Sequence, residues 1–258
     1  MLAASAAWGV EPSMAQEAVA NLRSGRVASA VFSGKLASGK DSVADAVGVR
    51  LAELGLGQAR VHQTSEPMRR ELDEIIAIVG AAPSEDDAVL SLAREQNLSY
   101  LASVEITRVL FEKTRGALPK ASERTDTNRY LLQYLADEGR RSADPDYWVR
   151  KFFPTLMADL AEGRSALLSG IRHPNEILPA QVLGIMTVRL AVSRGVQENR
   201  LRGRDGLAPN PALIDSVNEC ALDGFVGFNL VVGNDDDMGA TVSCVIDHLI
   251  PHVQGLLD

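Results

Sequence analysis

One nine-residue stretch, residues 34–42, constrains the fold of this 258-residue chain more than any other. It reads Gly-Lys-Leu-Ala-Ser-Gly-Lys-Asp-Ser and fits the phosphate-loop pattern G-x-x-x-x-G-K-[ST] except at the last place, where Asp41 stands. Residues 27–32 before it are apolar and β-prone, and apolar residues recur at helical spacing over 43–54. The stretch therefore predicts a strand, a glycine loop and a helix, in that order.

Each residue type in this loop suits phosphate binding for a separate reason. Gly34 and Gly39 let the backbone curl so that successive N–H groups point toward phosphate oxygens. The helix that begins near Lys40 adds its positive dipole end, and the Lys40 ammonium can reach the terminal phosphates of a nucleotide. A carboxylate at Asp41 can offer Mg²⁺ a charged oxygen where the usual pattern offers a neutral hydroxyl. The alternative is a plain glycine turn in an α/β protein.

We expect the loop to bind a nucleotide with most of its length, and Asp41 to bind the metal as well. The expected nucleotide-binding residues are Gly34, Lys35, Ala37, Ser38, Gly39, Lys40, Asp41 and Ser42.

Composition excludes several classes of protein. A formal net charge of −8 argues against a general nucleic-acid-binding surface. The two cysteines are too few for a disulfide framework or a cysteine metal site. No apolar run approaches the roughly 18 residues that span a bilayer. Residues 1–12 are rich in alanine but lack a basic segment followed by an apolar core, so we expect a loose tail rather than a signal peptide.

The phosphate loop also resembles that of a particular family. Residues 39–45, Gly-Lys-Asp-Ser-Val-Ala-Asp, are similar to the G-K-D-[ST]-x-A-[DE] motif of the deoxynucleoside monophosphate kinases of tailed bacteriophages and their bacterial relatives. Animal phosphomevalonate kinases share the G-K-D variant. The resemblance implies a small-molecule phosphotransferase that uses ATP and Mg²⁺.

Residues 64–163 contain almost no strand signal and several amphipathic helical stretches. A crossover between parallel strands normally needs one helix, so about a hundred residues here predict a helical insertion. The resemblance implies that this insertion binds the phosphate acceptor. The alternative is a helical cap that serves packing or a homodimer.

Two segments of the insertion match motifs of the same family. Residues 65–70 resemble its A-x-P-L-K segment, with Arg69 in place of the lysine. Residues 129–149 resemble R-x-L-L-Q-x-L-G-T-E-x-G-R followed by D-P-D-x-W-V, with Ala-Asp in place of Gly-Thr at 136–137. The resemblance implies arginines for an acceptor phosphate, a glutamine for a base edge and an aromatic ring for stacking. The residues that it designates for the acceptor are Arg69, Arg129, Gln133, Arg140 and Trp148. The alternative for Trp148 is a core aromatic.

The second half of the chain supplies the remaining candidates. Residues 172–176, Arg-His-Pro-Asn-Glu, match the family pattern D-x-R-[FH]-P-N-E, but its leading aspartate is Gly170 here. Residues 194–204 contain four arginines on a polar helix, which suits a lid over a transferring phosphoryl group; a solvated basic helix face is the alternative. The candidate catalytic residues are Lys40, Arg172, Arg200 and Arg204.

These observations combine into one expected architecture and function. We expect an α/β fold of the phosphate-loop NTPase type, with a parallel sheet in the order 2-3-1-4-5 between helical layers. Residues 1–26 would form a tail and a short helix, 27–63 with 164–258 the kinase core, and 64–163 the insertion.

The expected activity is ATP-dependent phosphorylation of a (deoxy)nucleoside monophosphate in the cytoplasm of a bacterial or phage-infected cell. Its partners would be small-molecule nucleotides, with no nucleic acid or membrane involved. Two alternatives are a kinase for another phosphorylated small molecule, such as phosphomevalonate or dephospho-coenzyme A, and a nucleotide-binding regulator with little catalysis. The absent aspartate at Gly170 favours the regulator.

Overall fold

The computed structural model describes residues 2–114, 119–123, 125–205 and 211–254. They form two compact units. The first combines the described residues of 1–64 and 149–258, and the second contains those of 65–148. Each unit is described by itself.

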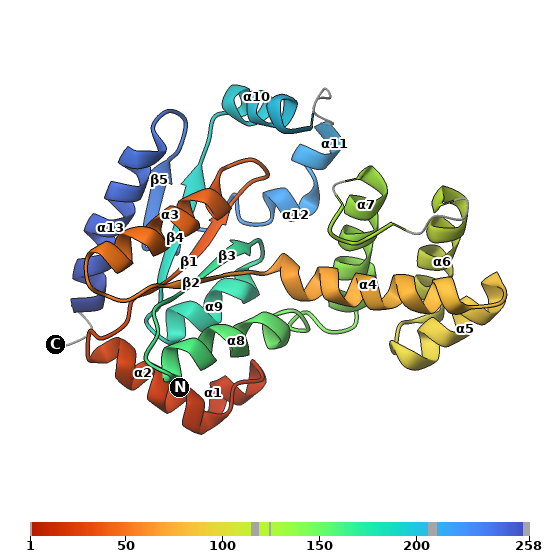
Figure 1. Cartoon of the computed structure of the whole chain (residues 1–258), viewed down its shortest axis with the longest axis horizontal. Helices are drawn as coiled ribbons and strands as arrows, with labels where there is room; N and C mark the ends of the chain where they lie inside the picture. Colours follow the sequence, from red (N-terminus) through yellow and green to blue (C-terminus); the bar gives the residue numbers. More distant parts are fainter. Residues whose placement is uncertain (1, 115–118, 124, 206–210, 255–258) are drawn as a thin grey trace. The chain divides into compact units, whose positions relative to one another are not determined.

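A five-stranded sheet forms the centre of the first unit (Figure 1). Its strands are β1 (Ser29–Gly34), β2 (Arg60–Gln63), β3 (Ala166–Ile171), β4 (Met186–Ala191) and β5 (Leu230–Gly233). They lie in the order β2-β3-β1-β4-β5, and every neighbouring pair is parallel. Every residue of the central strand β1 is buried, as expected for a parallel sheet covered on both faces. The predicted strand order is therefore confirmed.

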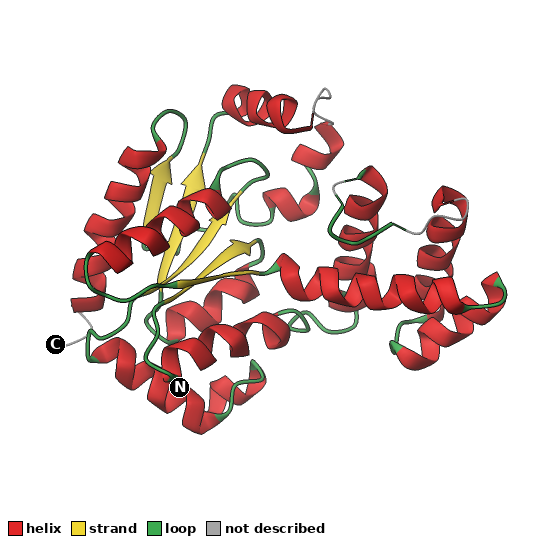
Figure 2. Ribbon diagram, in the orientation of Figure 1, coloured by secondary structure: helices red, strands yellow, loops and turns green. Residues whose placement is uncertain are grey.

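Helices cover both faces of this sheet, which gives the predicted three layers (Figure 2). The helices of the first unit are α1 (Leu2–Ala7), α2 (Pro12–Arg23), α3 (Lys40–Glu53), α8 (Val149–Ala161), α9 (Pro174–Val182), α10 (Arg194–Asp205), α11 (Pro211–Ile214), α12 (Val217–Cys220) and α13 (Met238–Gln254). Helices α3 and α13 bury their apolar sides on the sheet, where Val43 and Leu249 join Phe32 in one core. Helix α9 packs on β1 and β4, and α8 packs on β2 and β3.

Two boundaries differ from the sequence-based expectation. Residues Leu2–Ala7, expected to be part of a loose tail, form helix α1, whereas α2 matches the short helix expected after that tail. The Trp8 ring packs edge-on against Phe153 of α8 with centroids 6.1 Å apart. Helix α8 was expected within the insertion but belongs to the first unit. The reason is its packing: α8 contacts α2, β2 and β3, and Asn21 donates to the carbonyl of Leu160 at 2.9 Å.

The second unit is the helical insertion, and all regular structure in its described residues is helical. It contains α4 (Ser65–Ala81), α5 (Glu85–Glu95), α6 (Tyr100–Thr114), α7 (Asp126–Tyr134) and a π-helical segment, η1 (Leu135–Arg141). The side chains of Ser84 and Thr125 accept backbone N–H groups at the starts of α5 and α7, so both helices have a local signal for where they begin. Across the described part of both units, no helix has the length and apolar character needed to cross a membrane.

A buried carboxylate fastens the edge strand β2 to helix α8. Asp159 is almost fully buried and accepts hydrogen bonds from Arg60 (3.2 Å), from the His62 ring (2.7 Å) and from Arg164 Nε (2.9 Å). Burial alone would raise the pKa of Asp159, but the hydrogen bonds from Arg164 and His62 hold it below its ordinary value. The cluster therefore stabilises the fold while Asp159 is ionised.

We predict that Asp159→Asn destabilises the protein by about 1.5–3 kcal/mol at pH 7, because charge-assisted hydrogen bonds to a buried carboxylate are lost. A carboxyl with a lowered pKa contributes stability above its unfolded pKa of about 3.9, and this contribution is lost as the pH falls through the folded value. The difference between wild type and variant should therefore shrink below about pH 4. Urea unfolding of wild type and variant at pH 7 and pH 3 measures this difference in unfolding free energy.

Glu162→Gln is the matched control, because Glu162 pairs with the same arginine, Arg164, but is 60% exposed. It should change the unfolding free energy by less than about 1 kcal/mol. An Asp159→Asn variant as stable as this control at pH 7 would contradict the role assigned to Asp159.

Candidate functional site: the phosphate loop

The loop predicted to bind phosphate runs from the end of β1 to the start of α3, and its two glycines are needed there. Gly39 caps α3 with a left-handed φ of 83°, and a Cβ at this position would lie 2.5 Å from Asn234 Nδ2. A Cβ on Gly34 would overlap the Ser38 side chain and lie 3.0 Å from the Leu190 carbonyl oxygen. Only glycine fits such close approaches. The loop thus has the tight turn that the sequence motif predicts.

Side chains from three other segments bind the backbone of this loop. The Leu36 N–H donates to Glu219 Oε2 at 2.6 Å, and the Leu36 carbonyl accepts from Gln197 Nε2 at 2.8 Å. The Ser38 carbonyl accepts from Asn234 Nδ2 at 2.7 Å. These three partners come from α12, α10 and the end of β5, so segments far apart in the sequence define the loop together.

Arg200, a candidate catalytic residue, also braces the loop. Its Nη1 lies 3.4 Å from the carbonyl oxygens of Ala37 and Ser38, and its Nη2 donates to the Asn234 carbonyl at 2.6 Å. Carbonyl groups of a curled loop need donors when they are withdrawn from water. Arg200 therefore lies beside the loop, and in this structure its hydrogen bonds satisfy carbonyl groups.

Lys40 is the buried cation of the site, with 9% of its side chain exposed. Burial lowers the pKa of its ammonium below the ordinary value, and the positive charges of Arg172 and Arg204 lower it further. The carboxylates of Asp41 and Glu219 act in the opposite direction. Three of the four candidate catalytic residues, Lys40, Arg172 and Arg204, are thus close enough to affect one another electrostatically.

Arg172 follows β3 and is held at both ends. Its backbone N–H donates at 2.8 Å to Glu176 Oε2, which also accepts the N–H of His173 at the start of α9, and its guanidinium pairs with Glu219. Lys35, in contrast, lies 2.7 Å from Asp223, and that hydrogen bond raises the pKa of its ammonium. The sequence motif gave no sign of the acidic partners Glu219 and Asp223.

Asp41, the residue expected to bind Mg²⁺, is half exposed. It lies in the first turn of α3, where its Oδ1 accepts from the Ser169 hydroxyl at 2.7 Å, and its side chain is 51% exposed. Its second oxygen, 4.0 Å from the Lys40 ammonium, retains coordination capacity. Within the described residues no group of three or more His, Cys, Asp or Glu side chains could hold a metal, so Asp41 would bind Mg²⁺ together with phosphate oxygens and water.

Ser38 offers a further indication that the loop fits phosphate. Its hydroxyl is fully buried and, among the described residues, finds no hydrogen-bond partner. A buried hydroxyl without a partner costs free energy that a bound anion or water can recover. Ser42, by contrast, is exposed on the first turn of α3.

Gly170, which stands where the family motif has an aspartate, is an extra residue in β3. The pairing of β1 with β3 shifts by one residue, from Phe32 opposite Ser169 to Ser33 opposite Ile171. Gly170 has a φ of 98°, and a Cβ on it would lie 2.5 Å from Thr64 Oγ1, which also donates to the Gly170 carbonyl at 2.9 Å. The local backbone therefore disfavours any side chain at this position.

Two of the residues expected to bind the acceptor are buried within the insertion. Trp148 is fully buried, and its indole N–H donates to the Ala136 carbonyl at 3.1 Å, so it is a core aromatic and offers no face for a base. Arg140 is 7% exposed and pairs with Glu71 at 2.5 Å. Its guanidinium also lies 4.9 Å from the centroid of the Tyr147 ring. Both expectations are corrected: these side chains stabilise the insertion.

The other three expected acceptor residues are partly exposed. Arg69 lies on α4, and Arg129 lies on α7 with its Nη1 3.8 Å from Asp126. Gln133 follows Arg129 by one helical turn. Arg129 and Gln133 therefore lie on one side of α7.

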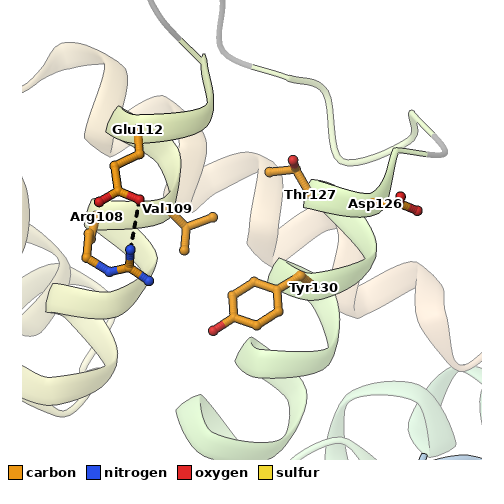
Figure 3. A pocket seen from close by; sticks show the side chains of 6 residues that line it. All are labelled: Arg108, Val109, Glu112, Asp126, Thr127 and Tyr130. Carbon is orange, nitrogen blue, oxygen red and sulfur yellow. Dashed lines mark hydrogen bonds and ion pairs between the residues drawn. The ribbon is translucent and has the colours of Figure 1, made fainter. Parts of the chain in front are cut away.

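A pocket of about 430 Å³ lies between α6 and α7 in the same unit (Figure 3). It is lined by Arg108, Val109, Glu112, Asp126, Thr127 and Tyr130. Arg108 is bound by carboxylates on its own helix, with 2.8 Å to Glu112 and 2.7 Å to Glu105. Among the described residues, none of those expected to bind the acceptor lines this pocket, and the one cation in its described lining, Arg108, is already paired.

Comparisons with known proteins add no independent support for these assignments. No protein-family model matches the chain, and no curated protein matches it. The assignment of site residues therefore depends on the sequence motifs and on the geometry described above.

We predict that Gly170→Ala destabilises the protein by about 2 kcal/mol or more, because a left-handed residue costs about 1–2 kcal/mol and the new Cβ must also displace Thr64. Gly163→Ala is the control: Gly163 has a φ of 76° but open space around its Cβ. It should lose only the conformational part. Urea unfolding measures the loss of stability in both variants, and Gly170→Ala in a Thr64→Ala background isolates the part that comes from the clash with Thr64. Equal losses of stability in Gly170→Ala and Gly163→Ala would contradict a steric contribution at Gly170.

Proposed function

We propose that the protein is an ATP-dependent phosphotransferase that converts a (deoxy)nucleoside monophosphate into the diphosphate. The observation that carries the proposal is the loop between β1 and α3, with buried Lys40 and the charges of Arg172 and Arg204 beside it. A phosphoryl transfer needs donor and acceptor held in line and the charge of the transferred group neutralised, without a covalent intermediate. Lysine and arginine side chains around a phosphate loop meet the second requirement.

The donor site follows from the loop. The N-terminal amides of α3 and the Lys40 ammonium would bind the phosphates of ATP. The negative charge of a triphosphate would also raise the pKa of the Lys40 ammonium, which opposes the effect of burial. Asp41 would hold Mg²⁺ on the exposed side of the same turn, and the metal supplies charge neutralisation between the donor's phosphates.

The acceptor is assigned to the insertion on the strength of the motif resemblance. Arg69 and Arg129 remain candidates for the acceptor phosphate, and Gln133 remains the candidate for a base edge. We propose that the protein acts on small-molecule nucleotides in the cytoplasm, without a nucleic acid or a membrane as a partner. A monophosphate is already a nucleophile at neutral pH, so no general base is required.

One observation favours a second candidate, a nucleotide-binding regulator with little catalysis. The backbone at Gly170 disfavours a side chain, so the carboxylate that the family motif provides there is absent from the site. Asp41 then stands as the one acidic metal ligand that the loop motif provides.

An acceptor screen tests the proposal. Purified protein is incubated with ATP, Mg²⁺ and each ribonucleoside or deoxyribonucleoside monophosphate, and the diphosphate product is separated by chromatography. Phosphomevalonate and dephospho-coenzyme A form a second acceptor set. The proposal expects turnover with at least one monophosphate; binding of ATP without phosphorylation of any of them, at millimolar Mg²⁺, supports the regulator.

We predict that Lys40→Ala lowers kcat by about 100-fold or more, because one lysine at the transferred phosphoryl group contributes several kcal/mol to the transition state. Arg50→Ala is the matched control, since Arg50 lies on the same helix, is 53% exposed and pairs only with Glu53 among the described residues. Circular dichroism verifies that both variants fold. If Lys40→Ala kept more than a tenth of the wild-type kcat, Lys40 would not have the proposed catalytic role.

We predict that Asp41→Asn raises the Mg²⁺ concentration for half-maximal activity about tenfold, because a carboxylate ligand is lost, while ATP still binds through the loop amides in the absence of metal. Asp45→Asn, one turn later on α3 and exposed, is the control for the loss of one negative charge. Steady-state rates across a Mg²⁺ series measure the effect. If the two variants show the same dependence of rate on Mg²⁺ concentration, Asp41 is not the metal ligand.

A further inference from the structure

The carboxylate of Glu219 lies on the phosphate loop in the way that a bound anion would. Its Oε2 accepts the backbone N–H of Leu36 at 2.6 Å, and its Oε1 accepts from the Arg172 guanidinium. Its side chain is only 9% exposed, although α12, which carries it, contains no buried residue. Glu219 therefore projects inward from a surface helix to reach the loop.

The groups that hold Glu219 are those that would hold a phosphate. A loop N–H, an arginine and a lysine are the standard donors to a phosphoryl group. Leu36 and Arg172 provide the first two, and the negative charge of Glu219 acts directly on Lys40. A carboxylate and a phosphate cannot both occupy these donors, so one must displace the other.

We propose that Glu219 is a built-in competitor of the phosphate donor, which occupies the loop when no nucleotide is bound and is displaced by an incoming triphosphate. The inference rests on the proposed function, because it assigns the contested position to the donor's phosphates. Glu219 thereby lowers the apparent affinity for ATP and leaves Leu36 and Arg172 paired in the resting protein.

Neighbouring ion pairs keep the competitor close to the loop. Asp215, four residues earlier, pairs with Arg194 at 2.6 Å. Asp223, four residues later, lies 2.7 Å from Lys35 and pairs with Arg189 at 2.8 Å. A tethered group competes at a high effective concentration, because its partner does not diffuse away. The carboxylate of Glu219 can thus turn away from the loop while α12 stays attached.

The test measures anion affinity with Glu219 neutralised. Isothermal titration compares wild type with Glu219→Gln, using ATP with Mg²⁺ and, separately, inorganic tripolyphosphate. Charge-assisted hydrogen bonds are about twice as strong as neutral ones, so both anions should bind about tenfold more tightly to the glutamine variant. Asp215→Asn is the matched control, because it removes one negative charge from the same segment without freeing a loop donor.

The outcomes separate this inference from the proposed function. Tighter binding of both anions by Glu219→Gln, without a similar gain for Asp215→Asn, supports the competitor. Equal gains for the two variants, unchanged affinity or weaker binding overturn it. Glu219→Ala, which removes the acceptor oxygens altogether, must show the same direction, and circular dichroism confirms that each variant is folded.

Activity is measured in parallel. If the protein phosphorylates a monophosphate but Glu219→Gln binds the anions no more tightly than wild type, only the proposal that Glu219 competes with the donor is overturned. If Glu219→Gln binds tripolyphosphate more tightly but no acceptor is phosphorylated, the competitor proposal stands and the proposed kinase activity is overturned. If neither wild type nor Glu219→Gln binds either anion, both proposals fail.

Discussion

The first unit depends on how one curled loop satisfies its backbone. The turn after β1 withdraws carbonyl and N–H groups from water, and each of these needs a partner. Gln197, Arg200 and Asn234 supply donors to the carbonyls, and Glu219 accepts a loop N–H. Because these residues come from α10, α12 and the end of β5, the loop makes these hydrogen bonds with the C-terminal half of the first unit. The site and the fold are thus stabilised by the same contacts.

Much of the fold could be predicted from local sequence patterns. Buried strands such as β1 read as apolar runs, and the glycine loop fixes which strand precedes which helix. The insertion could also be recognised, because a hundred residues of helical periodicity exceed what a crossover needs. The prediction that α8 belongs to the insertion was wrong. The contacts of α8 with α2 and β2 join residues that lie far apart in the sequence, and local patterns do not reveal such contacts.

The candidate site was predictable in its motif and less so in its surroundings. Lys40 and Arg172 were expected to be close, and the structure brings their charges together. Glu219 carried no local signal, because its role depends on long-range contacts that spacing does not reveal. Arg140 was assigned by motif alone, and a carboxylate 69 residues away, Glu71, binds it instead.

The extra residue in β3 also restricts how this site can change during evolution. A side chain at Gly170 would meet Thr64 and would need a backbone angle that L-residues avoid, so gaining a carboxylate there takes more than one mutation. A first step at Thr64 would lose the hydrogen bond to the Gly170 carbonyl before any benefit appeared. The two positions are therefore epistatic, and the order of the mutations decides whether the path is open. A lineage that carries this bulge is confined to metal sites that do not use position 170.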